Sequence, residues 1–207
     1  MKPDLDEINK RTLRYWYIDG LAEMAIGGVF LFIGAFLLFT TLVPSSILKA
    51  IMGAVFFPIL LVGSMYLGGK LVAKAKSSLT YPRTGFVAYR RKRSKRGTLL
   101  LIAATVIIVL LVGMLADSTI KDFGWMPLMD GLFLGIISLY IGQGLGRFYL
   151  LSAASFAAGL LFAVLGLNDY LGHGSFYAAM GVFFLISGVA TLLSYLHQHP
   201  DREEELS

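Results

Sequence analysis

Long apolar stretches alternate with short polar connections along the whole chain. A helix needs roughly 20 apolar residues to cross a hydrocarbon core of about 30 Å. Stretches of this kind occupy residues 21–43, 47–68, 98–116, 127–146, 148–166 and 176–196. The pattern therefore predicts an all-α integral membrane protein with six transmembrane helices.

The connections between the predicted spans are short, with one exception. Residues 69–97 form a long basic loop, whereas residues 1–20 are charged and aromatic and residues 197–207 are acidic. We therefore expect one six-helix membrane domain over residues 21–196. It follows an N-terminal segment at the membrane surface and precedes a short acidic tail in water.

Lysine and arginine fall almost entirely on one side of this topology. Of the 18 basic residues, all but Lys49 and Lys121 lie in the N-terminal segment, the long loop, the turn between spans four and five, or the tail. Short cytoplasmic loops carry an excess of lysine and arginine. The asymmetry predicts that both termini are cytoplasmic and that the protein lies in the plasma (inner) membrane.

The composition excludes a water-soluble domain of ordinary kind. Apolar residues make up 57% of the chain and charged residues 15%, with a mean hydropathy of +0.73, against about 45–50% and about 25% in soluble proteins. The chain has no cysteine, which excludes disulfides, thiolate metal sites and cysteine nucleophiles. His197 and His199 lack a third ligand nearby in the sequence, so we predict no metal and no cofactor.

Ionisable residues near the start of the first span are the strongest candidates for a functional site. Glu23 lies one turn into this span and four residues after Asp19, so both share a helix face. Gln143 and Arg147 come at the same side of the membrane, at the end of span four. We hypothesise an inner-leaflet polar cluster of these four residues, which requires spans one and four to be neighbours. Such a cluster either clamps helices together or exchanges protons or ions.

Small residues recur at helical spacing in several spans. One predicted packing seam in span four consists of Gly131, Gly135, Ser138, Gly142 and Gly146. Glycines also recur every seven residues in span one (Gly20, Gly27, Gly34) and before and within span six (Gly174, Gly181, Gly188). Stripes of this kind let helix backbones approach closely. They indicate a tightly packed bundle or a homodimer seam, or alternatively a sliding interface or the lining of a small pore.

The long loop ends in a dense basic run. Its members are Arg90, Arg91, Lys92, Arg93, Lys95 and Arg96. The run is a topology determinant, and it also suits contact with anionic lipid headgroups, each basic residue near the surface contributing about 1 kcal/mol. So close to a bilayer it favours lipid over nucleic acid. Residues 80–89, where Pro82 and Gly85 indicate a turn, form a candidate interaction segment.

No catalytic motif stands out, so the leading functional hypothesis is non-enzymatic. We expect an accessory, sensor or assembly subunit that contacts the lipid bilayer and forms a homo-oligomer or binds a partner membrane protein. The alternative is a small transporter or channel that uses the polar cluster around Glu23. An enzyme acting on lipids ranks third, because it would need a positioned base, nucleophile or metal.

Overall fold

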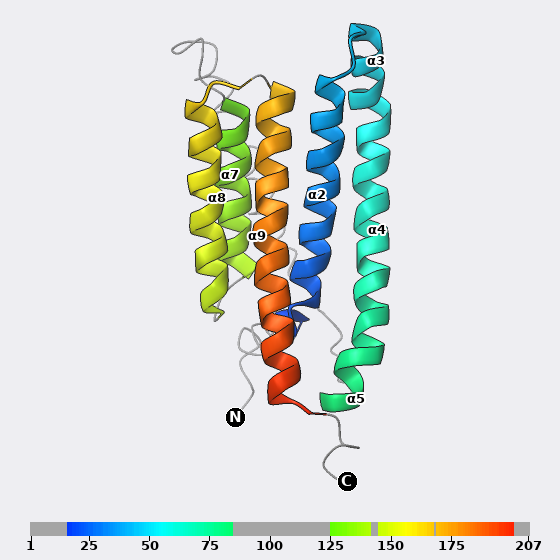
Figure 1. Ribbon diagram of the computed structural model, residues 1–207, viewed down its shortest axis with the longest axis vertical. Coiled ribbons are helices and arrows are strands. Elements are labelled where there is room, and N and C mark those ends of the chain that lie inside the picture. The colour runs from blue at the N-terminus through cyan, green and yellow to red at the C-terminus, as the bar shows by residue number, and fades with distance from the viewer. Residues whose placement is uncertain (1–15, 85–124, 142–144, 168, 201–207) are drawn as a thin grey trace, which may run out of the picture.

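The computed structural model describes residues 16–84, 125–141, 145–167 and 169–200, which form a bundle of upright helices (Figure 1). The elements are α2 (Leu21–Thr41), α3 (Ser46–Ile51), η1 (Met52–Phe56), α4 (Phe57–Ala75), η2 (Lys76–Thr80), α5 (Tyr81–Thr84), α7 (Trp125–Ile141), α8 (Gly146–Val164) and α9 (Asp169–Gln198). The segments η1 and η2 are π-helical. No strand occurs in this part of the chain, so the all-helical prediction is confirmed for it.

Four helical segments of the described chain are long and apolar enough to cross a membrane. They are Leu21–Thr41, Ser46–Thr80, Gly146–Val164 and Tyr170–Gln198, and α7 is a shorter apolar helix of 17 residues. These helices fit a membrane-embedded protein and overlap five of the predicted spans. Span 98–116 lies outside the described residues, so the count of six and the cytoplasmic termini stay predictions.

Two helices extend well beyond their predicted bounds. The helix of the second span continues through α4, η2 and α5 to Thr84, so residues 69–84 of the predicted loop 69–97 are helical. Pro82 accordingly lies in helix α5 rather than in a turn. Leucine, alanine and lysine, frequent just after residue 68, are good helix formers. Hydropathy therefore marks where the apolar stretch ends, and the helix itself continues. Helix α9 likewise begins at Asp169, before the predicted start of the sixth span at residue 176.

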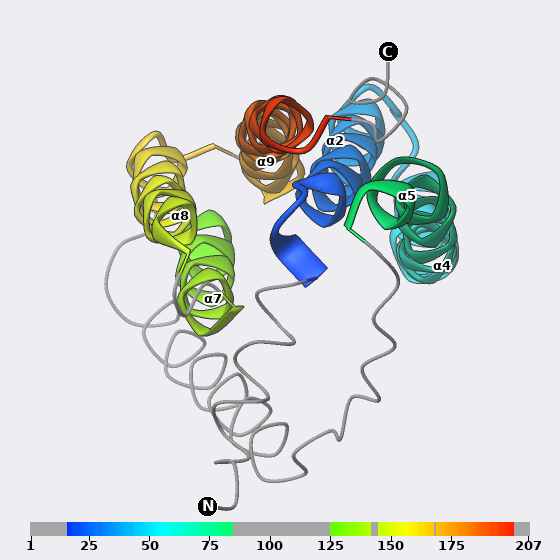
Figure 2. The same cartoon turned by 90° about the horizontal axis from the view of Figure 1, so that it is seen from below.

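The helices stand in an arc (Figure 2). Helices α7 and α8 pack together at one end of the arc, α9 and α2 follow, and α4 lies at the other end against α2. The starts of α2 and α8 and the ends of α4 and α9 meet at the lower end in Figure 1, called the inner end here and predicted to face the cytoplasm. The buried apolar core comes mainly from α7, α8 and α9 and comprises Leu134, Leu145, Phe148, Leu151, Ala158, Phe176, Met180 and Phe184.

The glycines spaced by seven residues meet each other in one antiparallel seam. Gly20, Gly27 and Gly34 of α2 lie against Gly188, Gly181 and Gly174 of α9, respectively. A methyl group added at Gly27 would lie 2.8 Å from the carbonyl oxygen of Gly181, and one at Gly34 would lie 2.9 Å from that of Gly174. Gly20 also has a φ of +74°, which favours glycine. The seven-residue spacing of these glycines is therefore explained by tight packing between α2 and α9 of the same chain.

A second small-residue seam joins α7 to α8. A methyl group added at Gly131 would lie 2.8 Å from the Cα atom of Gly159, and the Ser155 hydroxyl donates to the Gly131 carbonyl at 3.0 Å. The predicted seam members Gly135 and Ser138 also lie here: Ser152 Oγ donates to the Gly135 carbonyl at 2.9 Å, and Ser138 is buried.

The remaining two predicted members of the seam behave differently. Gly142 lies outside the described residues. Gly146 is the first residue of α8, and a methyl group there would meet no atom within 4 Å. Including Gly146 in the α7 seam was wrong, because α7 ends at Ile141 and helical spacing does not continue across the connection to α8.

Candidate functional site

Two buried carboxylates mark the start of α2. Asp19 precedes the helix and Glu23 lies in its first turn, and both side chains are 0% exposed. A carboxylate at a helix N-terminus is favoured by the helix dipole. Away from water, however, a charge is costly unless it is paired and hydrogen-bonded. Each carboxylate here meets a cation from a different helix.

Asp19 is paired with Lys76, the first residue of η2. The Lys76 ammonium lies 2.6 Å from Asp19 Oδ2 and is 1% exposed. The Thr80 hydroxyl donates to the same carboxylate oxygen at 2.9 Å, and the Leu21 amide donates to Oδ1 at 3.2 Å. Lys76 also donates to the Trp16 carbonyl at 2.9 Å and lies 5.0 Å from the centre of the Trp16 ring. The pair ties the end of the second span to the start of the first.

Glu23 is paired with Arg147, the second residue of α8. Arg147 Nε lies 2.7 Å from Glu23 Oε1, and the Ser187 hydroxyl of α9 donates to Oε2 at 2.7 Å. The guanidinium also donates through Nη2 to the Tyr17 carbonyl. Arg147 is 24% exposed whereas Glu23 is 0% exposed. The carboxylate therefore lies behind the arginine and binds α8 and α9 to α2.

Together these side chains form what we call the inner charge network. Its members are Asp19, Glu23, Lys76, Thr80, Arg147 and Ser187. They come from the start of α2 and the residue before it, from η2, from the start of α8 and from the second half of α9, which lie toward the inner end of the bundle (Figure 1). Segments of π-helix such as η2 occur frequently at functional sites. The network makes the first turn of α2 the point where four parts of the chain are joined.

The structure brings together part of the polar cluster that the sequence predicts. Glu23 and Arg147 are in contact, but Asp19 binds Lys76 instead, and Gln143 lies outside the described residues. The predicted pairing of spans one and four is not the packing observed, because α7 packs against α8 and α9. Arg147 reaches Glu23 from α8, since the chain reverses before α8 begins.

Three members of the network were missed by sequence reasoning. Lys76 and Thr80 fall in the region expected to be loop, where Lys76 is one of ten basic residues and has no distinguishing pattern. Ser187 could have been found from the sequence, because it precedes Gly188, one of the α9 glycines that recur every seven residues and face α2. Pairing the two glycine series in antiparallel order would have placed Ser187 near the start of α2.

A second polar cluster lies toward the opposite end of the bundle. Asp130 of α7 accepts a hydrogen bond from the Tyr177 hydroxyl at 3.2 Å and contacts His173 Nδ1. His173 and Asp130 are 25% and 18% exposed. We call Asp130, His173 and Tyr177 the outer polar cluster. It joins α7 to α9, and its carboxylate, unlike the two carboxylates of the inner charge network, is partly exposed.

The remaining predicted positions do not assemble into a site in the described part of the chain. No group of three or more His, Cys, Asp or Glu residues able to hold a metal ion occurs there. The His199 ring stacks on Tyr195 at 4.6 Å between ring centres. The basic run Arg90, Arg91, Lys92, Arg93, Lys95 and Arg96 lies outside the described residues.

Comparisons of the chain with protein-family models, with curated proteins and with solved structures found no match. The inner charge network is therefore the candidate site on its geometry alone. Its chemistry is that of opposite charges sequestered between helices.

Proposed function

We propose that the protein is a non-enzymatic, multi-pass protein of the plasma (inner) membrane that acts as an accessory or assembly subunit, with both termini in the cytoplasm. The observation that carries this proposal is the inner charge network. Its carboxylates are used to join helices, and each is bonded to groups from another part of the chain.

The bonding of the carboxylates supports a clamp over an exchange site. Both oxygens of Asp19 and both oxygens of Glu23 accept hydrogen bonds, and both side chains are 0% exposed. A carboxylate that takes up and releases protons or ions must reach water at some stage. Buried polar groups that bond across membrane helices fix their packing. A rigid bundle of this kind suits a subunit that presents fixed surfaces to a partner protein.

Native mass spectrometry of the tagged protein, extracted gently from its own membrane, tests this function. We expect a second membrane protein in stoichiometric amount, and the same complex when the tag is moved to that second protein. Extraction of the protein alone, or failure of the tagged second protein to retain it, would contradict an accessory role.

A small transporter or channel is the second candidate, and one observation favours it. His173 and Tyr177 of the outer polar cluster share one face of α9 with Ser187 of the inner charge network, at spacings of four, three, four and three residues through Met180 and Phe184. Met180 and Phe184 are 0% and 2% exposed. In this candidate the two polar sites would receive a proton or a cation at opposite ends of the bundle, and Met180 and Phe184 would block the path between them until the helices separate.

Flux measurements separate this candidate from the first. A transporter reconstituted in liposomes should carry protons or monovalent cations above the level of protein-free vesicles. Glu23→Gln should abolish that flux while the protein stays folded. Wild-type protein with no flux would exclude the transporter. Loss of folding in Glu23→Gln would favour the clamp.

A further inference from the structure

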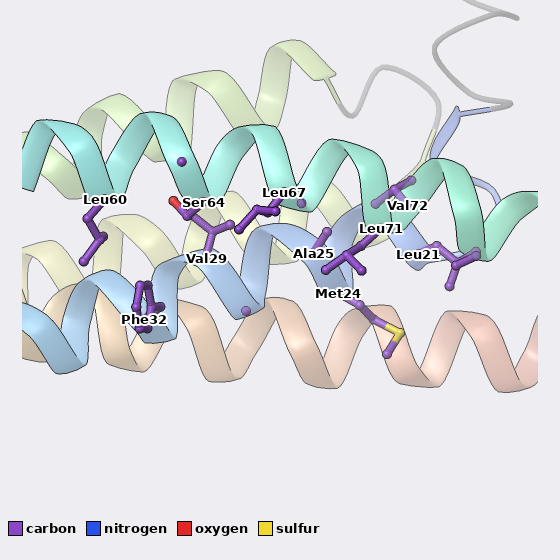
Figure 3. Close-up of a pocket in the computed structure, with 14 residues that line it drawn as sticks. Leu21, Met24, Ala25, Val29, Phe32, Leu60, Ser64, Leu67, Leu71 and Val72 are labelled. Carbon is purple, nitrogen blue, oxygen red and sulfur yellow. The ribbon is translucent and has the colours of Figure 1, made fainter.

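An apolar groove of about 540 Å³ runs between α2 and α4 (Figure 3). Its walls include Leu21, Met24 and Phe32 of α2 and Leu60 and Leu67 of α4. Ser64 is the one polar side chain of the lining, and its hydroxyl donates to the Leu61 carbonyl of its own helix at 3.0 Å. A ligand in this groove would therefore be recognised by shape and apolar contact.

Glycines on both helices create the hollow. A methyl group added at Gly28 of α2 or at Gly63 of α4 would meet no atom within 4 Å. At Gly68 the two helices come together, since a methyl group there would lie 3.6 Å from Val29 Cγ2. The groove is thus a place where side chains are missing between helices that touch nearby.

The dimensions of the groove fit an extended hydrocarbon chain. Its lining extends over Leu21–Phe32 of α2 and Leu60–Ala75 of α4, which is about 16–22 Å at 1.5 Å per residue. One leaflet of the hydrocarbon core is about 15 Å thick. The volume divided by this length is a mean cross-section of about 30 Å². The groove is therefore long and narrow, and it is wide enough for one acyl chain.

Two exposed lysines lie beside the inner end of the groove. Lys70 comes three residues after Leu67, and Lys74 comes three residues after Leu71, and both leucines line the groove. Residues three apart are neighbours on a helix, so both lysines lie on the side of α4 next to the groove. The groove ends at Leu21, the first residue of the span. A headgroup attached to a chain in the groove would therefore lie level with Lys74. Lys70 lies one turn further into the bundle, where its ammonium is 4.5 Å from the centre of the Tyr66 ring, and its long side chain can turn toward the headgroup. Ammonium groups attract anionic headgroups.

We propose that this groove binds one acyl chain of a phospholipid with an anionic headgroup, whose phosphate contacts Lys70 and Lys74. The lipid belongs to the leaflet at the inner end of the bundle. It fills the space that Gly28 and Gly63 leave open and lies alongside the Asp19–Lys76 pair, where α4 is tied to α2.

Native mass spectrometry with defined lipids tests this site. The full-length protein in mild detergent is titrated with phosphatidylglycerol or with phosphatidylcholine carrying the same acyl chains. We expect one phosphatidylglycerol to bind more tightly than phosphatidylcholine. Gly63→Leu fills the groove and should weaken binding of both lipids by about tenfold or more, the equivalent of losing about 1.4 kcal/mol. Gly69→Leu is the matched control, because Gly69 faces open space on the same helix without lining the groove.

The headgroup contact is tested separately. The double variant Lys70→Gln, Lys74→Gln should weaken phosphatidylglycerol binding by about 30-fold and phosphatidylcholine binding by much less, because the choline cation offsets the charge of its phosphate. Equal binding by Gly63→Leu and Gly69→Leu would overturn the proposal. So would a wild-type dimer that Gly63→Leu dissociates, since the groove would then hold a second copy of the chain. Gly28→Leu fills the groove from α2 and serves the same test if Gly63→Leu does not fold.

Discussion

Helix α2 has two faces on which glycine has opposite effects. Gly27 and Gly28 are adjacent in the sequence, yet Gly27 lies against the backbone of α9 and Gly28 faces the groove toward α4. On the first face the missing side chain lets two backbones meet. On the second it leaves a hollow. A glycine in a membrane helix therefore indicates close packing only when the opposite helix also has a small residue at the same depth.

The two faces are also held in different ways. The α2–α9 interface is closed along its length by three glycine pairs, whereas the α2–α4 interface is open over most of the groove and is tied by the Asp19–Lys76 pair at its inner end. Close packing thus stabilises one side of α2, and charge pairing with hydrogen bonds stabilises the other. The following substitutions separate these contributions.

The largest effect is expected from Gly27→Leu. Its side chain would begin 2.8 Å from the Gly181 carbonyl oxygen and the Leu185 amide nitrogen, and backbone atoms cannot move aside. The cost should exceed the about 1–3 kcal/mol of ordinary overpacking, so we expect little folded protein by size-exclusion chromatography in detergent. Gly28→Leu, one position later, should elute as the wild type does. Similar profiles for the two variants would contradict the difference between the faces.

Lys76→Met should have the next largest effect, because it leaves the Asp19 carboxylate buried without its cation. Removing one partner of a buried pair costs about 3–5 kcal/mol, measured as the free energy of unfolding in detergent. Lys74→Met changes an exposed lysine two positions away and should cost far less. The double variant Asp19→Leu, Lys76→Met should recover most of the lost stability. An unchanged free energy of unfolding in Lys76→Met would show that the pair does not hold α4.

Replacing glycine by alanine should stabilise the protein at the groove and destabilise it at the α2–α9 interface. Gly63→Ala places a methyl group in open space and should stabilise the protein by about 0.4–1 kcal/mol, because the unfolded chain loses freedom. Gly181→Ala should destabilise it, since the added methyl group would lie 2.7 Å from the Leu31 amide nitrogen. Unfolding in detergent measured side by side gives both signs. Destabilisation by Gly63→Ala would mean that the groove is filled closely in the folded protein.

The smallest effect is expected on the α7–α8 seam, which is closed in the same way as the α2–α9 interface but also carries hydrogen bonds. Ser155→Ala removes the bond to the Gly131 carbonyl and should cost about 0.6 kcal/mol, the average for such bonds between membrane helices. Ser64→Ala removes a bond within α4 only and should cost less. Equal losses for the two variants would show that the bond across the seam adds nothing.

Much of the fold could be predicted because apolar length is a local property. The stretches that include Leu21–Thr41 and Gly146–Val164 are recognisable without knowing their neighbours. The end of the second span could not be placed in this way, since lysines after residue 68 end the apolar stretch but also favour helix. The basic run at residues 90–96 and span 98–116 lie outside the described residues, so their roles stay predictions.

The candidate site was only partly predictable. Glu23 and Arg147 were recognised because ionisable groups in or beside an apolar span are costly. The partner of Asp19 was not recognised, because Lys76 is 57 residues away and resembles the other basic residues around it. Which cation pairs with which carboxylate depends on how the helices pack. The predicted cluster required the fourth span, α7, to lie beside the first span, but α7 packs against α8 and α9.

By itself, the sequence determines that this chain forms apolar helices, where most of them lie, and which residues are small or charged. These properties follow from local composition and helical periodicity. Only the tertiary structure decides that Gly27 closes an interface while Gly28 opens a groove, and that Asp19 is bound by Lys76. The reason is physical: a side chain's space and its partners are set by the opposite helix, whose identity and depth no single stretch of sequence specifies.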